Sequence, residues 1–129
     1  DRHRQFLQKE TSRIVGENTI GATIMIIEHY SKKNKKLIWV IENPATSKTW
    51  EYQKEHWCFR FNENKTYYSC YDKTFSPKPT IFKSNIKLNL KDKKIKGNND
   101  HMARGSYDKR SAIPLNLIRD IVFQLKAKA

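Results

Sequence analysis

The chain contains the stretch Leu37-Ile38-Trp39-Val40-Ile41-Glu42-Asn43-Pro44, in which five apolar residues lead directly into a glutamate. The apolar run does not alternate with polar residues, which is typical of a strand buried on both faces, as in a parallel sheet. Pro44 has no N–H for a sheet ladder, so we expect the strand to end before it. The stretch therefore predicts an α/β fold with Glu42 at the carboxyl end of a buried strand.

Glu42 is the most informative acidic residue of the sequence. Ligands of open α/β sheets collect beyond the carboxyl ends of the strands, and this position favours a functional role for the carboxylate. The competing interpretation is that Glu42 caps a neighbouring helix or pairs with one of the many lysines. Position alone does not decide between the two.

The residues before this strand predict a helix over 18–30. Ile20, Ile24 and Ile27 recur at helical spacing, which indicates a helix packed on a sheet. Asn18 is of a residue type that caps helix N-termini, and we expect the helix to begin there.

The residues after the strand predict a β-rich region. Residues 46–61 mix aromatic and charged side chains and fit either a loop with a short helix or an irregular pair of strands. Residues 67–71 and 80–84 predict two further strands, and 97–100 predict a polar loop. We expect this region to lie between the first strand and the end of the chain.

The end of the chain predicts an amphipathic helix over 114–126. Pro114 fixes a backbone angle suited to a first helical turn. The residues expected on the apolar face of this helix are Leu115, Ile118, Val122 and Leu125.

Length and charge restrict the class of protein. The 129 residues form one small domain or part of one, and they carry 26 Lys and Arg against 13 Asp and Glu, a net charge of +13. No stretch approaches the roughly 20 apolar residues that cross a bilayer, so we expect no membrane partner. Only two cysteines occur, too few for a disulfide-rich secreted protein, so we expect an intracellular, cytoplasmic location. The positive charge predicts attraction to polyanions, with DNA the expected partner.

Two lysine-rich stretches, 32–36 and 83–96, are candidates for contacts with DNA phosphates. The competing interpretation is that they are solvated surfaces. Six aromatic side chains either stack on unpaired bases or belong to the core. They are Trp50, Tyr52, Trp57, Tyr67, Tyr68 and Tyr71.

The histidines and cysteines do not form a recognisable motif. The spacing of His56, Cys58, Cys70 and His101 fits neither a zinc finger nor a zinc ribbon, so we predict no metal site. A small basic nuclease using His29, His56 or His101 as acid and base is a further alternative. No spacing pairs these histidines, which disfavours it.

Four short segments, in order, resemble a divergent, phage-associated branch of the DNA cytosine-5 methyltransferases. Ile38-Trp39-Val40-Ile41-Glu42-Asn43-Pro44 is similar to the Glu-Asn motif in its Glu-Asn-Pro form. Pro77-Lys78-Pro79-Thr80-Ile81-Phe82-Lys83-Ser84-Asn85 resembles the Lys-Pro-Thr segment, preceded by the tyrosine- and cysteine-containing residues 68–71. His101 lies where a histidine often follows, and Arg110-Ser111-Ala112-Ile113-Pro114 resembles the closing Arg-Ser-x-Ile-Pro segment. The order of the pieces makes the match more specific than any one of them.

The resemblance, which spans residues 12–126, implies a mechanism. In this family a cysteine thiolate adds to a flipped-out cytosine, and S-adenosylmethionine methylates the activated ring. The resemblance implies that Glu42 holds and protonates the ring nitrogen and that Asn43 shapes the strand end. It implies that Arg110, Ser111 and Pro114 lie near S-adenosylmethionine, although Arg110-Ser111 stands where the family has Gly-Asn.

Two parts of the family pattern are missing. The chain contains no Pro-Cys motif for the nucleophile and no Gly-x-Gly turn for the cofactor, both of which precede the Glu-Asn motif in the family. We therefore expect the C-terminal half of a methyltransferase, a subunit or a fragment, with the nucleophile and most cofactor contacts on a second chain or a missing segment. The isolated chain is expected to be inactive.

The resemblance and the pattern together predict part of a Rossmann-like methyltransferase sheet with a small basic β-rich lobe and a C-terminal helix. The expected segments are a helix and buried strand (1–45), the β-rich region (46–110) and the helix (111–129). The candidate DNA contacts are Lys78, Lys83, Lys87 and Arg104. The alternative function is a non-enzymatic basic DNA-binding module derived from a methyltransferase.

Overall fold

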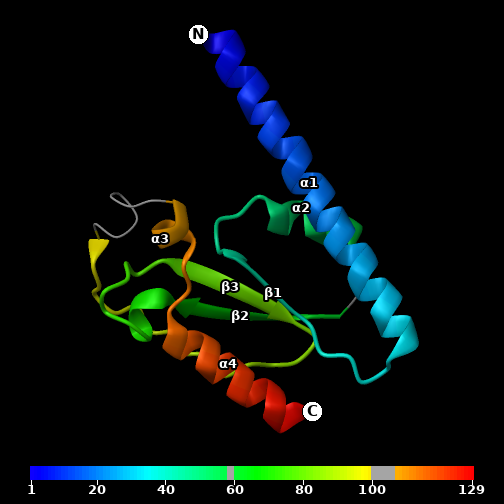
Figure 1. Ribbon diagram of the computed structural model, residues 1–129, viewed down its shortest axis with the longest axis vertical. Helices are drawn as coiled ribbons and strands as arrows, with labels where there is room; N and C mark the ends of the chain where they lie inside the picture. Colours follow the sequence, from blue (N-terminus) through cyan, green and yellow to red (C-terminus); the bar gives the residue numbers. More distant parts are fainter. Residues whose placement is uncertain (58–59, 100–106) are drawn as a thin grey trace. The chain divides into compact units, whose positions relative to one another are not determined.

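The computed structural model describes residues 1–57, 60–99 and 107–129 (Figure 1). The chain forms two compact units. The first comprises residues 1–37 and 47–59, and the second comprises residues 38–46 and 60–129. The segment 1–45, expected to hold a helix and a strand, thus contributes residues to both units.

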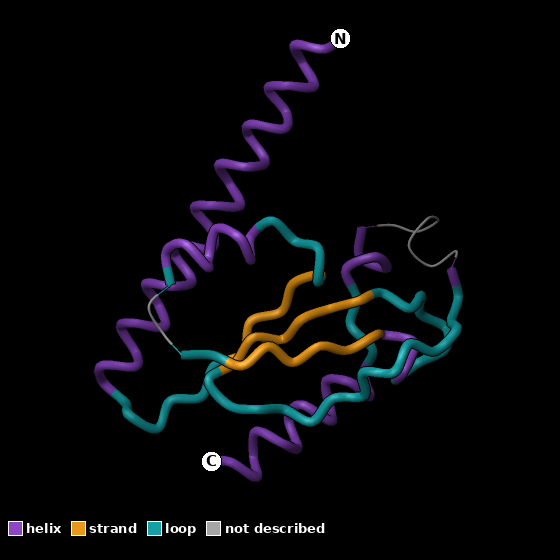
Figure 2. Tube along the Cα trace, turned by 180° about the vertical axis from the view of Figure 1, so that it is seen from behind, coloured by secondary structure: helices purple, strands orange, loops and turns teal. Residues whose placement is uncertain are grey.

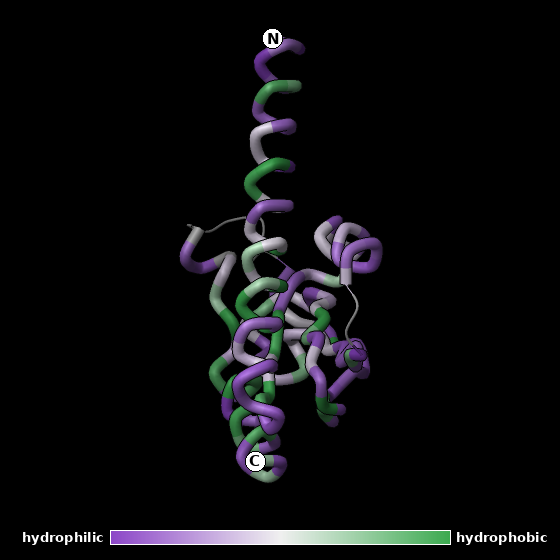
Figure 3. Tube along the Cα trace, turned by 90° about the vertical axis from the view of Figure 1, so that its right-hand side faces the viewer, coloured by the Kyte–Doolittle hydropathy of each residue, from purple (hydrophilic) through white to green (hydrophobic). Residues whose placement is uncertain are grey.

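The first unit consists of two helices, α1 (Arg2–Lys33) and α2 (Thr49–His56). The helix expected over 18–30 is present, but it begins 16 residues earlier, with Asp1 and not Asn18 as its N-cap. The early turns carry no continuous apolar face, and Figure 3 shows polar and apolar turns alternating along them. The sequence pattern missed these turns because only Ile20 and Ile27 of α1 are buried.

Of the two structures expected for residues 46–61, the loop with a short helix is confirmed by α2. Trp50 and Gln53 are its buried residues. The amide of Gln53 has no hydrogen-bond partner among the described residues.

The second unit contains a three-stranded sheet in the order β1-β3-β2. Its strands are β1 (Val40–Pro44), β2 (Asn62–Tyr67) and β3 (Pro79–Ser84), and both outer strands run antiparallel to β3. The strand expected over 80–84 is confirmed. The strand expected over 67–71 is wrong, because β2 ends at Tyr67 and a 3₁₀ helix, η1 (Tyr68–Cys70), follows.

β1 differs from the buried parallel strand that the apolar run predicts. It is an outer strand of an antiparallel sheet, all five of its residues are half-buried, and it includes Pro44. The proline is tolerated because the N–H of Ala45 donates to the Pro79 carbonyl at 3.0 Å. Since hydrogen-bonded pairs alternate along an antiparallel ladder, the nitrogen of Pro44 faces away from β3, where no ladder bond is needed.

The C-terminal helix α4 (Leu115–Lys128) is confirmed, but its buried face is not the expected one. Leu117 and Ile121 are buried and Leu125 packs against the same core, whereas Leu115, Ile118 and Val122 are exposed. The chain offers two apolar stripes at helical spacing, and periodicity alone cannot choose between them. The core beneath α4 is formed by Tyr68, Tyr71, Phe82, Leu88, Leu117 and Ile121. A short helix, α3 (Tyr107–Ser111), precedes α4.

A strap, residues 86–98, follows β3 and runs along β2 without forming a strand (Figure 2). The Asn64 side chain accepts from the Leu88 N–H at 2.8 Å, and the Thr66 hydroxyl donates to the Lys91 carbonyl at 2.7 Å. The strap also exchanges two hydrogen bonds with α4 through the amide of Gln124. Side chains of β2 and α4 therefore hold the strap in place.

No helix of the described residues is long and apolar enough to cross a membrane.

Candidate active site

Glu42 is the third of the five residues of β1, so it lies within the strand. The sequence predicts a different position, at the carboxyl end of the strand. Glu42 faces Phe82 across the ladder. Because side chains alternate along a strand, Glu42 lies on the same face as Val40, which packs against the core beneath α4. The carboxylate is therefore half-buried at the margin of the core.

The carboxylate of Glu42 is held by Tyr68. The Tyr68 hydroxyl donates a hydrogen bond to Glu42 Oε1 at 3.1 Å, and the Tyr68 side chain is only 2% exposed. Burial and the neighbouring Glu42 charge raise the pKa of the Tyr68 phenol above its ordinary value, so the phenol remains a hydrogen-bond donor at neutral pH. The Lys78 ammonium lies 5.4 Å from the centroid of the Tyr68 ring.

These contacts bring two sequence-predicted residues to one tyrosine, Glu42 at its hydroxyl and Lys78 over its ring. Tyr68 was expected only as part of a strand or as a stacking or core aromatic. Its role beside Glu42 depends on the turn into η1, which no residue spacing indicates.

The arrangement defines what this part of the molecule can do chemically. One oxygen of Glu42 is engaged by a phenol, and the other is left to accept a hydrogen bond from a ligand or to exchange a proton with it. Asn43 does not join this site through its side chain, since successive residues of a strand point to opposite faces of the sheet.

The described residues expected near S-adenosylmethionine make contacts within the fold. The Ser111 hydroxyl donates to the Asp108 carbonyl of its own helix at 3.3 Å. Pro114 is fully buried at the start of α4 and offers only an apolar ring. The side chain of Arg110 lies outside the described residues.

The candidate DNA contacts have different surroundings. Lys83 is 2% exposed, its ammonium lies 3.6 Å from the Glu63 carboxylate and 4.4 Å from the Phe61 ring centroid, and it is therefore not a surface contact. Lys87 is exposed in a groove of about 520 Å³ between β2 and the strap, together with Lys65 and Lys91. Arg104 and His101 lie outside the described residues.

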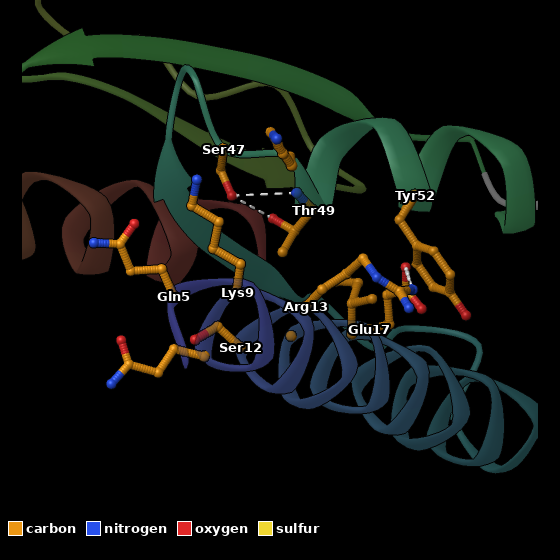
Figure 4. Close-up of a pocket in the computed structure, with 12 residues that line it drawn as sticks. Gln5, Lys9, Ser12, Arg13, Glu17, Ser47, Thr49 and Tyr52 are labelled. Atoms are coloured by element: carbon orange, nitrogen blue, oxygen red, sulfur yellow. Dashed lines mark hydrogen bonds and ion pairs between the residues drawn. The ribbon is translucent and has the colours of Figure 1, made fainter. Parts of the chain in front are cut away.

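A second groove, of about 690 Å³, lies in the first unit between α1 and residues 47–52 (Figure 4). Of the residues singled out from the sequence, Tyr52 lines it, one of the aromatic side chains considered for base stacking. Its polar lining includes Lys9, Arg13, Glu17 and Lys48. The sequence signal for it was weak, because these residues lie far apart in the chain.

The described histidines and cysteines do not gather. The thiol of Cys70 donates to the Lys93 carbonyl of the strap, and the His56 ring is stacked on Tyr52. No group of three or more potential ligands from His, Cys, Asp and Glu occurs within residues 1–57, 60–99 and 107–129. Cys58 lies outside these ranges.

Comparisons with protein-family models, curated proteins and solved structures find no match to this chain. The fold and the site define a mixed α/β protein with a three-stranded antiparallel sheet and a C-terminal helix. In its candidate site the Tyr68 hydroxyl donates to the Glu42 carboxylate.

Proposed function

We propose that this chain is the C-terminal part or a subunit of a DNA cytosine-5 methyltransferase that binds DNA and supplies Glu42. The single observation that carries the proposal is the hydrogen bond from the buried Tyr68 hydroxyl to Glu42 within the Glu-Asn-Pro segment. In the proposed reaction Glu42 holds and protonates the ring nitrogen of a flipped-out cytosine, which makes the ring more electrophilic. The phenol fixes one carboxylate oxygen so that the other addresses the base.

The position of β1 supports the proposed second chain. The N–H groups of Ile41 and Asn43 face β3, whereas those of Val40 and Glu42 face away, as the Ala45–Pro79 hydrogen bond requires. Among the described residues β1 pairs with β3 alone. The apolar run 37–41, which leads into β1, is typical of a strand with neighbours on both sides. A strand of the partner chain would supply the second neighbour.

The partner chain, or a missing segment of a longer chain, also supplies what these 129 residues lack. It carries the Pro-Cys nucleophile and the binding site for S-adenosylmethionine, the methyl donor of the reaction. The net charge of +13 supports DNA as the shared substrate. We propose an intracellular, cytoplasmic location, because the proposed substrate is DNA inside the cell.

Native mass spectrometry of the protein isolated from its own source tests the proposal. A complex with a second chain that contains a Pro-Cys motif, and that methylates cytosine in DNA, is the expected result. Methyl transfer by the isolated 129-residue chain, or a native protein that consists of this chain alone, would overturn it.

Glu42→Gln in the assembled protein separates the enzyme from the alternative, a DNA-binding module without chemistry. Methylation is expected to fall by orders of magnitude while DNA affinity changes little, because Glu42 is not a phosphate contact. Unchanged methylation would remove Glu42 from the mechanism. Glu55→Gln is the matched control, since it makes the same change at an exposed position of α2.

A further inference from the structure

The groove of the first unit has a basic end. Lys9 from α1 reaches toward Ser47 at the start of the second wall, and Lys48 lines the same wall (Figure 4). Both lysines are exposed, and neither forms a salt bridge with any described residue. Their charges are therefore available to an anionic ligand.

The middle of the groove carries one net negative charge, from one arginine and two glutamates. The Arg13 guanidinium lies 2.8 Å from the Glu10 carboxylate and 3.0 Å from the Glu17 carboxylate. Two acidic partners compensate its single charge, so Arg13 adds little attraction for an anion. This leaves the Lys9 and Lys48 end as the part of the groove that favours negative charge.

The other end of the groove is aromatic. Tyr52 lines it beside Ile20, and the Tyr52 ring is stacked on His56 with 4.3 Å between ring centroids and 13° between ring planes. A planar aromatic pair is the kind of surface on which an unpaired nucleobase stacks. The groove volume of about 690 Å³ lies within the usual range of small-ligand sites.

We infer that this groove binds one nucleotide unit of a single-stranded nucleic acid, with the phosphate at Lys9 and Lys48 and the base at Tyr52. A single strand is required because the bases of a duplex are already stacked and cannot reach an aromatic side chain. The inference is independent of Glu42 and of the proposed methyl transfer.

Titration of the full chain with an oligonucleotide of eight thymidines tests the inference. Lys9→Gln with Lys48→Gln is compared with Lys126→Gln and Lys128→Gln, which removes the same charge from the exposed last turn of α4. The first pair is expected to weaken binding about tenfold and to reduce the salt dependence by about 0.7 logarithmic units per decade, the value for one neutralised phosphate. The control pair is expected to change affinity less than about twofold.

Tyr52→Leu tests the aromatic end. Loss of one stacked base is expected to weaken binding about 5- to 100-fold, with helix content checked by circular dichroism. Amide chemical shifts of residues 47–52 are expected to move on binding in the wild type. Equal losses for the two lysine pairs, no binding of the oligonucleotide, or equal binding of a duplex would each overturn the inference.

Discussion

The two outer strands of the sheet, β1 and β2, differ in their sequences and in whether another segment of the chain runs along them. β2 is polar in sequence, carries exposed Glu63 and Lys65, and has the strap running along it. β1 begins with Val40 and Ile41, carries no lysine, and has no such strap among the described residues. Charged side chains are a common protection of outer strands against pairing with other chains. The comparison teaches that this fold protects β2 and leaves β1 suited to pairing.

The hydrogen bonds of Asn64 explain how the strap stays on β2. Its side-chain amide donates to the Phe82 carbonyl at 3.0 Å and its oxygen accepts from the Leu88 N–H at 2.8 Å, both in a buried position. No residue of β1 has an equivalent pair among the described contacts.

Asn64→Leu is expected to have the largest effect on this comparison. It leaves the Leu88 N–H without its partner, and the free energy of unfolding is expected to fall by about 3 kcal/mol. Urea denaturation followed by circular dichroism measures the change. Lys65→Gln, one residue along on the exposed face, is the control and is expected to stay within about 0.5 kcal/mol. Equal values for the two variants would contradict the role of the strap.

Gly97→Ala is expected to loosen the far end of the strap. A Cβ at Gly97 would lie 2.1 Å from the Phe75 carbonyl oxygen and 2.7 Å from Ser69 Cβ, so the backbone must shift. We expect a loss of about 2 kcal/mol in thermal or urea denaturation. Gly16→Ala is the matched substitution in α1, where a Cβ meets nothing within 4 Å. It is expected to stabilise the helix by about 0.5–1 kcal/mol, and a loss there would contradict the account.

High pH is expected to lower the free energy of unfolding, measured by urea denaturation, through two buried tyrosines, one that contacts β1 and one that contacts the strap on β2. Tyr68 donates to Glu42 of β1, whereas Tyr71 donates to Asp120 and accepts from the Lys91 N–H of the strap. Burial first, and then the acidic partner, raise the pKa of both phenols above 10.0. The stabilisation is therefore complete below about pH 10 and is lost as the pH rises through the folded-state values.

Glu42→Gln is expected to have the smallest effect of these changes, on the pKa of one of the two tyrosines. Removing the carboxylate charge is expected to lower the pKa of Tyr68 and to leave that of Tyr71 unchanged. Phenolate absorbance during a pH titration, with tyrosine-specific NMR signals, measures both. A shift of Tyr71 and not of Tyr68 would contradict the placement of Glu42.

Much of the architecture could be predicted from local patterns. The strand at 80–84 and the helix after Pro114 follow from β-forming residues and from the backbone angle of proline. The continuous apolar run at 37–41 located β1 but misjudged its surroundings, because a run without alternation does not report which strands lie beside it.

The candidate site could be predicted only in part. Glu42 was found because it follows an apolar run, but its partner Tyr68 depends on a contact across 26 positions of sequence. Lys83 was misjudged because a lysine in a strand looks the same in sequence whether it is exposed or buried beside an exposed partner such as Glu63. Such contacts are set by tertiary packing.

Amide hydrogen exchange of the two outer strands tests the central claim, that β1 pairs with a strand of a partner chain. In the isolated chain Val40 and Glu42 are expected to exchange fast, and Ile41 and Asn43, which face β3, slowly. In the complex from the native source Val40 and Glu42 are expected to become slow, while Glu63 and Lys65 of β2 stay fast. Fast exchange of Val40 and Glu42 in a complex that methylates DNA would contradict the claim, as would slow exchange in the isolated chain.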